Sequence, residues 1–323
     1  MKKYLVTLLV ALIFATADAQ ESVTFEFSDG IEQSALKTKM EKQVGALLTA
    51  INRAAANGTD INYTGIDINP LASQSLGQTW NVVHFSTEDT DYVDHCIRQK
   101  TKSGRLRGFQ VRNIGVTMQP VDGTYDGPER RELAIDFGPN GKIEDVNFTM
   151  GTTEYGNLIK TGEQLGDLDR RMQIIHWCEQ FQNAYNKCDM EFMNRIFSDD
   201  AIIITGKITS RPGGRSDVRM ANPQKVEYVQ QTKEQYLGNL GRLFKRAKYI
   251  NVKFSDYKIV RHGSKPNYYG VTLKQDFATN TYKDQGIVFL VWDFSNEDEP
   301  KIHVRTWQPM TEQAFALGDF RLP

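Results

Sequence analysis

Apolar residues recur with two different periods along the chain, and each period predicts one type of element. Residues 23–27 alternate as a strand does. Apolar residues three or four apart over 36–51 predict a helix that ends at an Asn-Gly pair. A strand is predicted at 107–118, and alternation over 133–148 around an Asn-Gly turn predicts a hairpin. The first half of the chain is therefore expected to mix helix and strand.

The second half is expected to begin with helices and to end with strands. A long amphipathic helix is predicted from about Asp167, a short one over 190–197 and a third over 233–247. A break at 198–200 is expected before an apolar strand at 201–205. The apolar face of the long helix consists of Ile174, Cys178, Phe181, Tyr185 and Cys188. The last four strands are predicted at about 250–261, 267–279, 285–295 and 301–308.

This order of elements predicts an α+β fold. With helix, short helix, strand, helix and four long antiparallel strands, one curved sheet can wrap around the helices and form a cone with an open mouth. We therefore expect a C-terminal cone-shaped curved antiparallel sheet packed on three helices, preceded by a smaller α+β domain. The stretch rich in Gly, Thr and Glu after residue 150 is taken as the boundary, so the domains span 20–152 and 153–323.

The N-terminus predicts export. Two lysines precede an apolar run at 4–15, and Ala-Asp-Ala at 17–19 is a small-x-small cleavage site. Residues 1–19 are thus expected to be a signal peptide, with Gln20 as the mature N-terminus in the periplasm or outside the cell. An uncleaved anchor is the alternative. No later apolar run reaches the roughly 18 residues of a spanning helix, which predicts no stable membrane insertion.

Composition narrows the classes of function. The chain carries 39 Lys and Arg against 40 Asp and Glu, and a net charge of −1 argues against nucleic acid as a partner. The sequence lacks the signatures of a nucleophile elbow, a zinc peptidase, a phosphate-binding loop and a dinucleotide fold. Its five histidines lack metal-site spacing. We therefore expect no cofactor and no metal.

The three cysteines are too few for a disulfide scaffold. Cys178 and Cys188 are expected on one helix, where ten residues rise about 15 Å, beyond the reach of a disulfide. Both are expected to be small buried apolar side chains. Cys96 could pair with one of them only where the two domains touch.

Three short segments of the second half carry a family resemblance. They are residues 181–189 (FQNAYNKCD), 197–201 (FSDDA) and 305–309 (RTWQP). Together with the order of elements, they make residues 167–310 resemble the nuclear transport factor 2-like superfamily, also called SnoaL-like or ketosteroid-isomerase-like. The resemblance implies the cone fold and a pocket between the long helix and the concave face of the sheet. It implies no single activity, because the superfamily serves isomerases, dehydratases and binding modules alike.

Strand parity selects residues for that pocket. On the last strand His303, Arg305 and Trp307 share one face. Trp307 offers an apolar surface, Arg305 a cation and His303 a group that can carry a proton, and this combination suits a small polar or anionic ligand. The alternative is a solvated outer face. Gln275 is the one polar side chain on an otherwise apolar face of its strand, so its amide needs a hydrogen-bond partner. Either it faces the pocket, or it lies in the core and bonds to neighbouring backbone. The predicted pocket consists of Trp177, Tyr185, Gln275, His303, Arg305 and Trp307.

The strand at 286–294 is apolar on both faces, so both faces should be covered. The second face could meet the N-terminal domain or another subunit, or it could be buried by packing within the chain. The pattern leaves these alternatives open.

Three functions remain open at this point. We expect a non-catalytic small-ligand-binding or protein-interaction module, because no catalytic set is recognisable. One alternative is a small-molecule isomerase or dehydratase, with His303 or Asp200 as the acid–base group near Tyr185. The other is a structural scaffold that forms a homodimer through the sheet.

Overall fold

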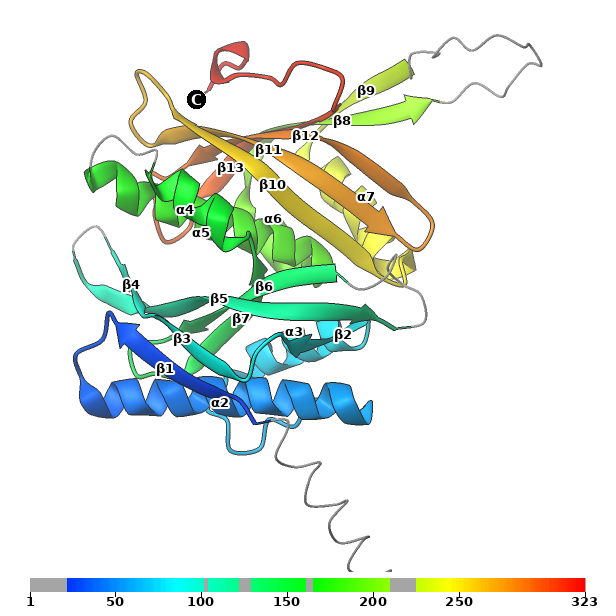
Figure 1. The fold of residues 1–323 in the computed structure, drawn as a ribbon. Helices are drawn as coiled ribbons and strands as arrows, with labels where there is room; N and C mark the ends of the chain where they lie inside the picture. The colour runs from blue at the N-terminus through cyan, green and yellow to red at the C-terminus, as the bar shows by residue number, and fades with distance from the viewer. Residues whose placement is uncertain (1–21, 102–103, 122–128, 161–164, 210–224, 323) are drawn as a thin grey trace, which may run out of the picture. The chain divides into compact units, whose positions relative to one another are not determined.

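The structure is a computed structural model, and it describes residues 22–101, 104–121, 129–160, 165–209 and 225–322. The chain divides into two compact units, one ending at Tyr155 and the other beginning at Gly156 (Figure 1). The expected signal peptide, residues 1–19, lies outside the described residues. No helix of the described part is both long enough and apolar enough to cross a membrane.

The N-terminal unit combines a long helix with two small sheets. Strands β1 and β3 pair in parallel, and a second sheet has the order β2-β5-β6-β7 with β4 on β5. The strands are β1 (Thr24–Asp29), β2 (Val83–Thr87), β3 (Asp91–His95), β4 (Ile97–Lys100), β5 (Leu106–Pro120), β6 (Glu129–Phe137) and β7 (Ile143–Thr149). The helices are α2 (Ser34–Asn57), α3 (Pro70–Trp80) and α4 (Thr152–Lys160), the last of which crosses into the second unit.

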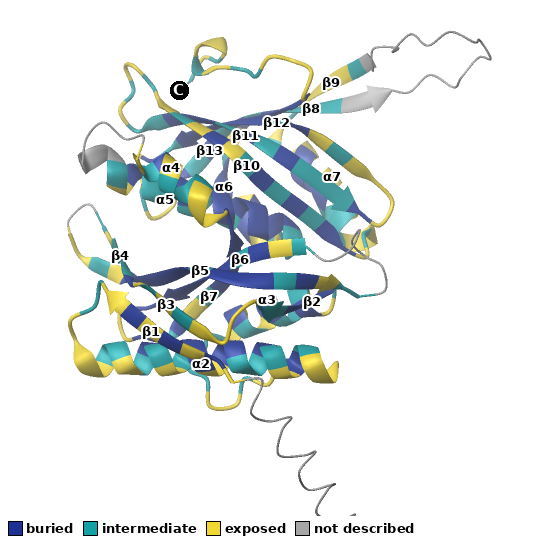
Figure 2. Cartoon of the chain, viewed as in Figure 1, coloured by how far each residue is buried: buried dark blue, intermediate teal, exposed yellow. Residues whose placement is uncertain are grey.

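The predicted helix and hairpin of this unit are confirmed. Along α2 buried and exposed residues follow the helical period (Figure 2), and Gly58 ends the helix with φ 62°, a left-handed conformation that glycine adopts without strain. In the hairpin β6–β7, Gly141 has φ 74°, as the predicted Asn-Gly turn requires.

Residues 59–105 contain α3 and the strands β2, β3 and β4, none of which the sequence predicted. The strands have only four or five residues, and β3 and β4 alternate between exposed and half-buried positions. Elements this short carry too few apolar repeats to be recognised. The start of α3 did carry a signal, because the Asn69 side chain caps the helix and Pro70 is its first residue.

The C-terminal unit is built on one six-stranded sheet of order β10-β11-β12-β13-β8-β9, antiparallel except for the pair β13 and β8. The strands are β8 (Phe197–Thr209), β9 (Lys225–Gln231), β10 (Ile250–Arg261), β11 (Tyr268–Thr279), β12 (Lys283–Asp293) and β13 (Lys301–Pro309). The helices are α5 (Leu165–Asn186), α6 (Met190–Ile196), α7 (Lys233–Arg246) and the short 3-10 helix η1 (Leu317–Asp319).

Helices cover one side of this sheet, which we call the inner face. Side chains of α5 bond to β10, because Gln182 accepts from the Phe254 N–H and Asn186 accepts from the Val252 N–H. The Phe181 ring packs between the rings of Phe197 and Phe254, with centroid distances of 5.8 and 6.0 Å. The predicted α+β fold, with a cone-like curved antiparallel sheet on helices, is confirmed (Figure 1).

The helix boundaries follow from capping, with two corrections. Asp189 caps α6 and Thr232 caps α7. Cys188 is not on the long helix as predicted, because α5 ends at Asn186 and Cys188 has φ 53° in the turn to α6. The predicted break at 198–200 is also wrong, since β8 already begins at Phe197, but its pairing with β13 shifts register across these residues.

The three cysteines are free thiols. Cys178 is buried as predicted, Cys188 is only half-buried, against the prediction, and Cys96 is buried as well. Burial raises the pKa of the Cys96 thiol to about 11, so this thiol is protonated and unreactive at neutral pH.

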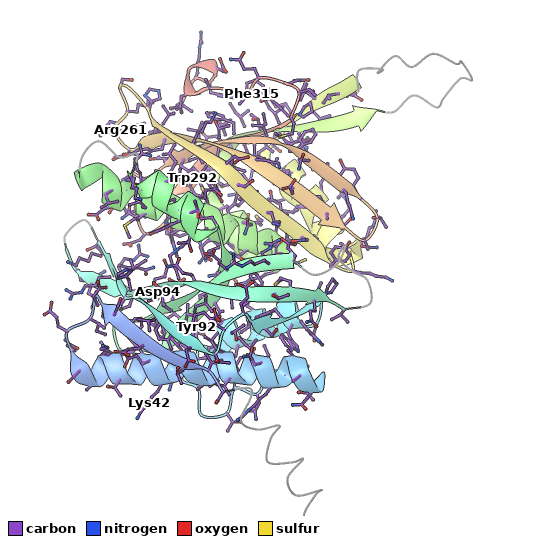
Figure 3. All side chains as sticks on the ribbon, viewed as in Figure 1. Lys42, Tyr92, Asp94, Arg261, Trp292 and Phe315 are labelled. Atoms are coloured by element: carbon purple, nitrogen blue, oxygen red, sulfur yellow. The ribbon has the colours of Figure 1, made fainter. Side chains whose placement is uncertain are left out.

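The other side of the sheet, the outer face, is partly covered by the C-terminal segment of the same unit. Phe289, Val291 and Val304 are buried there beneath four half-buried side chains of the segment. These are Phe315, Leu317, Phe320 and Leu322. Trp292 lies on the helix side of the sheet and Phe315 on the segment side (Figure 3). At these positions the second covered face of β12 is thus explained by packing within the chain.

A glycine on β12 leaves room for the Trp307 side chain. A Cβ atom on Gly286 would lie 2.5 Å from the Trp307 indole and 2.5 Å from the Gln308 carbonyl oxygen. Gly286→Ala is therefore expected to destabilise the unit by about 1–3 kcal/mol, the usual cost of overpacking. Urea unfolding measures the change. The control is Gly263→Ala, where a Cβ meets nothing within 4 Å, and an equal effect of both substitutions would contradict this prediction.

Candidate functional site

Polar and aromatic side chains gather on the inner face toward one end of the sheet. We call them the inner cluster, and it consists of Tyr185 on α5, Tyr236 on α7, Gln275 on β11, Asp284 on β12, and Arg305 and Trp307 on β13. The strand register brings the β11 and β12 residues together. Gln275 pairs with Gly286, and two residues further along the same face Phe277 pairs with Asp284. Glycine at position 286 gives the Trp307 indole its space.

Arg305 is the charged centre of the inner cluster. Its side chain is buried, with the residue only 5% exposed. One terminal nitrogen, Nη2, lies 3.4 Å from Gln275 Oε1, and the guanidinium stands 5.3 Å from the centre of the Tyr236 ring. Among the described residues, neither Nε nor Nη1 has a hydrogen-bond acceptor. A buried guanidinium with two unsatisfied donor nitrogens is costly.

Two tyrosines flank the guanidinium. The hydroxyl groups of Tyr185 and Tyr236 share a hydrogen bond. Burial raises the pKa of Tyr236 well above its usual value, although the charge of Arg305 acts in the opposite direction. Burial lowers the pKa of Arg305, but interactions with Tyr185, Tyr236 and Asp284, among them a hydrogen-bonding interaction with Tyr185, together outweigh it, and the pKa is raised. At neutral pH the Tyr236 hydroxyl is therefore neutral and lies beside a permanent cation.

Two further atoms of the cluster lack a partner within the described chain. They are the indole nitrogen Nε1 of Trp307 and the carboxylate oxygen Oδ1 of Asp284. The other oxygen, Oδ2, accepts from the Tyr282 hydroxyl at 2.8 Å. Burial raises the pKa of Asp284, while the Tyr282 hydrogen bond and the charge of Arg305 lower it in part.

The arrangement suits the recognition of an organic anion. Three N–H donors, two on Arg305 and one on Trp307, have no acceptor in the described residues and share one face. Carboxylate oxygens match a guanidinium in shape and charge. The described residues contain no group of three or more His, Cys, Asp or Glu side chains that could hold a metal ion.

Four of the six predicted pocket residues meet in the inner cluster: Tyr185, Gln275, Arg305 and Trp307. Trp177 does not join them. It is half-buried on α5, and its ring stacks on Phe192 of α6 at 6.1 Å.

His303 does not share a face with Arg305 and Trp307 as parity predicted. Val291 pairs with Val304 but Trp292 pairs with Ile302, so β13 contains one extra residue, His303, opposite β12. Such a bulge reverses the parity of every residue before it relative to those after it. His303 consequently lies beside Tyr268, which packs against the buried residues of the outer face, and the two ring centroids are 5.6 Å apart.

The two candidates for the acid–base group, His303 and Asp200, lie together, but away from Tyr185. His303 Nδ1 is 3.5 Å from Asp200 Oδ1, and its Nε2 is 3.6 Å from Asp293 Oδ2. The Asp200 side chain is 65% exposed. The structure therefore does not bring the predicted acid–base group to the tyrosine hydroxyl that would stabilise a reacting oxygen.

Sequence reasoning missed Asp284 and Tyr236 as site residues. Asp284 lies one residue before the predicted start of its strand, and extending the alternation by that residue would have placed it on the inner face. Tyr236 falls within the predicted third helix, over 233–247. Its contact with Tyr185, 51 positions away, leaves no local signal in the sequence.

Comparisons with known proteins give fold-level similarity at most. No known family matches the chain, and no curated protein does. Among solved structures, Bdellovibrio bacteriovorus Bd1075 has a TM-score of 0.33 at 17% identity, over 52% of this chain and 47% of its own, so the match spans about half of that protein.

Two other similar structures carry a family description. A putative dehydratase from the NTF2-like family of Streptomyces avermitilis has a TM-score of 0.32 at 12% identity, over 44% of this chain and 96% of its own. An NTF2-like protein from Cytophaga hutchinsonii has a TM-score of 0.31 at 16% identity, over 43% of this chain and 98% of its own. These values are consistent with an NTF2-like part of the chain, and they carry no argument about family membership or activity.

Proposed function

We propose that this protein is an exported, non-catalytic module that binds a small organic anion at the inner cluster of its C-terminal domain, residues 153–323. One observation carries the proposal: Arg305 is buried, and two of its nitrogens, Nε and Nη1, have no acceptor in the described residues. A buried charge whose donors are only partly satisfied is costly, and a bound carboxylate offsets that cost.

The aromatic side chains around the cation support an aromatic or aliphatic body for the ligand. Trp307, Tyr185 and Tyr236 are each less than a tenth exposed. Binding sites for small molecules commonly combine such apolar lining with a few polar groups that fix orientation.

Thermal unfolding with matched ligands tests the proposal. Benzoate and propanoate are expected to raise the melting temperature, whereas benzamide and propanamide are not, because the amides keep the shape but lack the charge. At a ligand concentration 100 times the dissociation constant, the stabilisation is about 2.7 kcal/mol. The proposal fails if no carboxylate shifts the transition, or if the amides shift it equally.

One observation supports a second candidate, an isomerase or dehydratase. Asp284 is a carboxyl group with a raised pKa on the same face as the tyrosine pair, which is the combination used to move a proton next to a stabilised oxygen. In this case Asp284 takes the role that the sequence assigned to His303 or Asp200. Turnover of a ligand found in the thermal assay distinguishes the two functions.

Export and dimerisation stay proposals that rest on the sequence. Mass spectrometry of protein secreted by an expressing bacterium should give Gln20 as its first residue, and retention of residues 1–19 would refute the cleavage. Light scattering tests the homodimer through the sheet. Such a dimer would have to displace the C-terminal segment or use other parts of the outer face.

A further inference from the structure

The inner cluster presents two opposite kinds of unsatisfied polar group. Arg305 and Trp307 offer N–H donors, whereas Asp284 Oδ1 is an acceptor, and among the described residues none of these atoms has a partner. A ligand with only a carboxylate would satisfy the donors and leave the Asp284 oxygen unpaired. Buried polar groups are rarely left unpaired, because each one costs about 1–3 kcal/mol.

The strand register places the donors and the acceptor on the same face of the sheet. Asp284 and Gln275 occupy successive inner positions, and Gln275 Oε1 reaches the guanidinium. The charge of Arg305 lowers the pKa of Asp284, and Asp284 in turn raises the pKa of Arg305. The two side chains nevertheless form no direct ion pair among the described residues. The two charges can therefore both engage one compact ligand placed between them.

Alternative partners for the Asp284 oxygen are few on this face. The neighbouring inner residues on β12 are Gly286 and Val288, and on β11 the paired residue is Phe277. None of these side chains can donate a hydrogen bond. The nearest donors on this face are Gln275, Arg305 and Trp307, and among the described residues none of them bonds to Oδ1, which leaves this oxygen open to a donor on a ligand.

We propose that the ligand is a small carboxylic acid that also carries a hydrogen-bond donor, a hydroxyl or an ammonium group, near its carboxylate. The carboxylate accepts from Arg305 and Trp307, and the second group donates to Asp284 Oδ1. This inference rests on the proposed function and narrows it from organic anions in general to hydroxy or amino acids.

Two matched ligand sets test it by calorimetry on the full-length protein. The first set is 3-phenylpropanoate, 3-phenyllactate and phenylalanine, which differ only by H, OH or an ammonium group at C2. The second is propanoate, lactate and alanine. In at least one set, a donor-bearing acid is expected to bind tenfold or more tightly than its parent acid.

Two variants of Asp284 separate recognition from folding. Asp284→Leu removes the acceptor and is expected to abolish the preference for the donor-bearing acid. Asp284→Asn keeps an acceptor oxygen without the charge, so it should retain the preference for a hydroxyl group and lose that for an ammonium group. The control, Asp276→Asn, alters a carboxylate of β11 on the opposite face and is expected to leave the preference unchanged.

The outcome separates the two levels of the proposal. If the parent acids bind as tightly as the donor-bearing acids in both sets, or if Asp284→Leu keeps the preference, the inference is overturned while carboxylate binding at Arg305 stands. If none of the six ligands and no carboxylate of the thermal assay binds, the proposed function itself fails.

Discussion

Phe181→Ala is expected to lower the free energy of unfolding of the C-terminal unit by about 3–5 kcal/mol, the range for removing a fully buried phenylalanine side chain. Phe181 is 0% exposed and lies where α5 meets the inner face of the sheet. Its ring contacts those of Tyr185, Phe197 and Phe254 at 5.1–6.0 Å. A cavity here has aromatic walls from three different elements, which cannot all move inward to close it.

Urea unfolding followed by tryptophan fluorescence measures this loss. Of the four tryptophans only Trp80 belongs to the N-terminal unit, so the signal reports mainly on the unit that contains Phe181. The control is Val260→Ala on β10, where the side chain is 60% exposed and the expected change is below about 0.5 kcal/mol. A loss under about 1 kcal/mol for Phe181→Ala would show that the helix does not pack on the sheet as described.

Arg305→Met is expected to weaken carboxylate binding roughly 30-fold or more without lowering the stability of the free protein. Removing one partner of a buried charge pair costs about 2–5 kcal/mol, and each 1.4 kcal/mol is a factor of ten in affinity. The free protein, by contrast, loses a buried cation with two unsatisfied N–H groups and gains an apolar side chain of similar length.

Calorimetry with benzoate and urea unfolding of the free variant measure both effects. Arg261→Met is the matched control, because it removes one positive charge from an exposed position of β10 and should change neither quantity. Arg305→Lys keeps the charge but loses the planar fork, so an intermediate affinity is expected. If Arg305→Met unfolds the protein, Arg305 stabilises the fold, and the expectation of unchanged stability is wrong. If it binds benzoate as tightly as the unaltered protein, the anion site lies elsewhere.

The sequence by itself determined the three long or capped helices α5, α6 and α7 and the last four strands of the C-terminal half, but it did not predict β9. Helices such as α7 and the last four strands present long apolar repeats of period 3.6 or 2, and burial of one face fixes those periods whatever the rest of the fold does. The same reasoning identified Arg305 and Trp307, because a cation and an indole in the middle of a strand stand out from the alternation.

The tertiary structure alone decided which side chains meet. The bulge at His303 depends on how β13 fits both of its neighbours, and this one extra residue separates a side chain that local parity had joined to Arg305. The pairing of Tyr185 with Tyr236 and the approach of Asp284 to Arg305 join positions far apart in the chain. Periodicity is a property of one segment at a time, whereas register and contact between segments are set by packing of the whole unit.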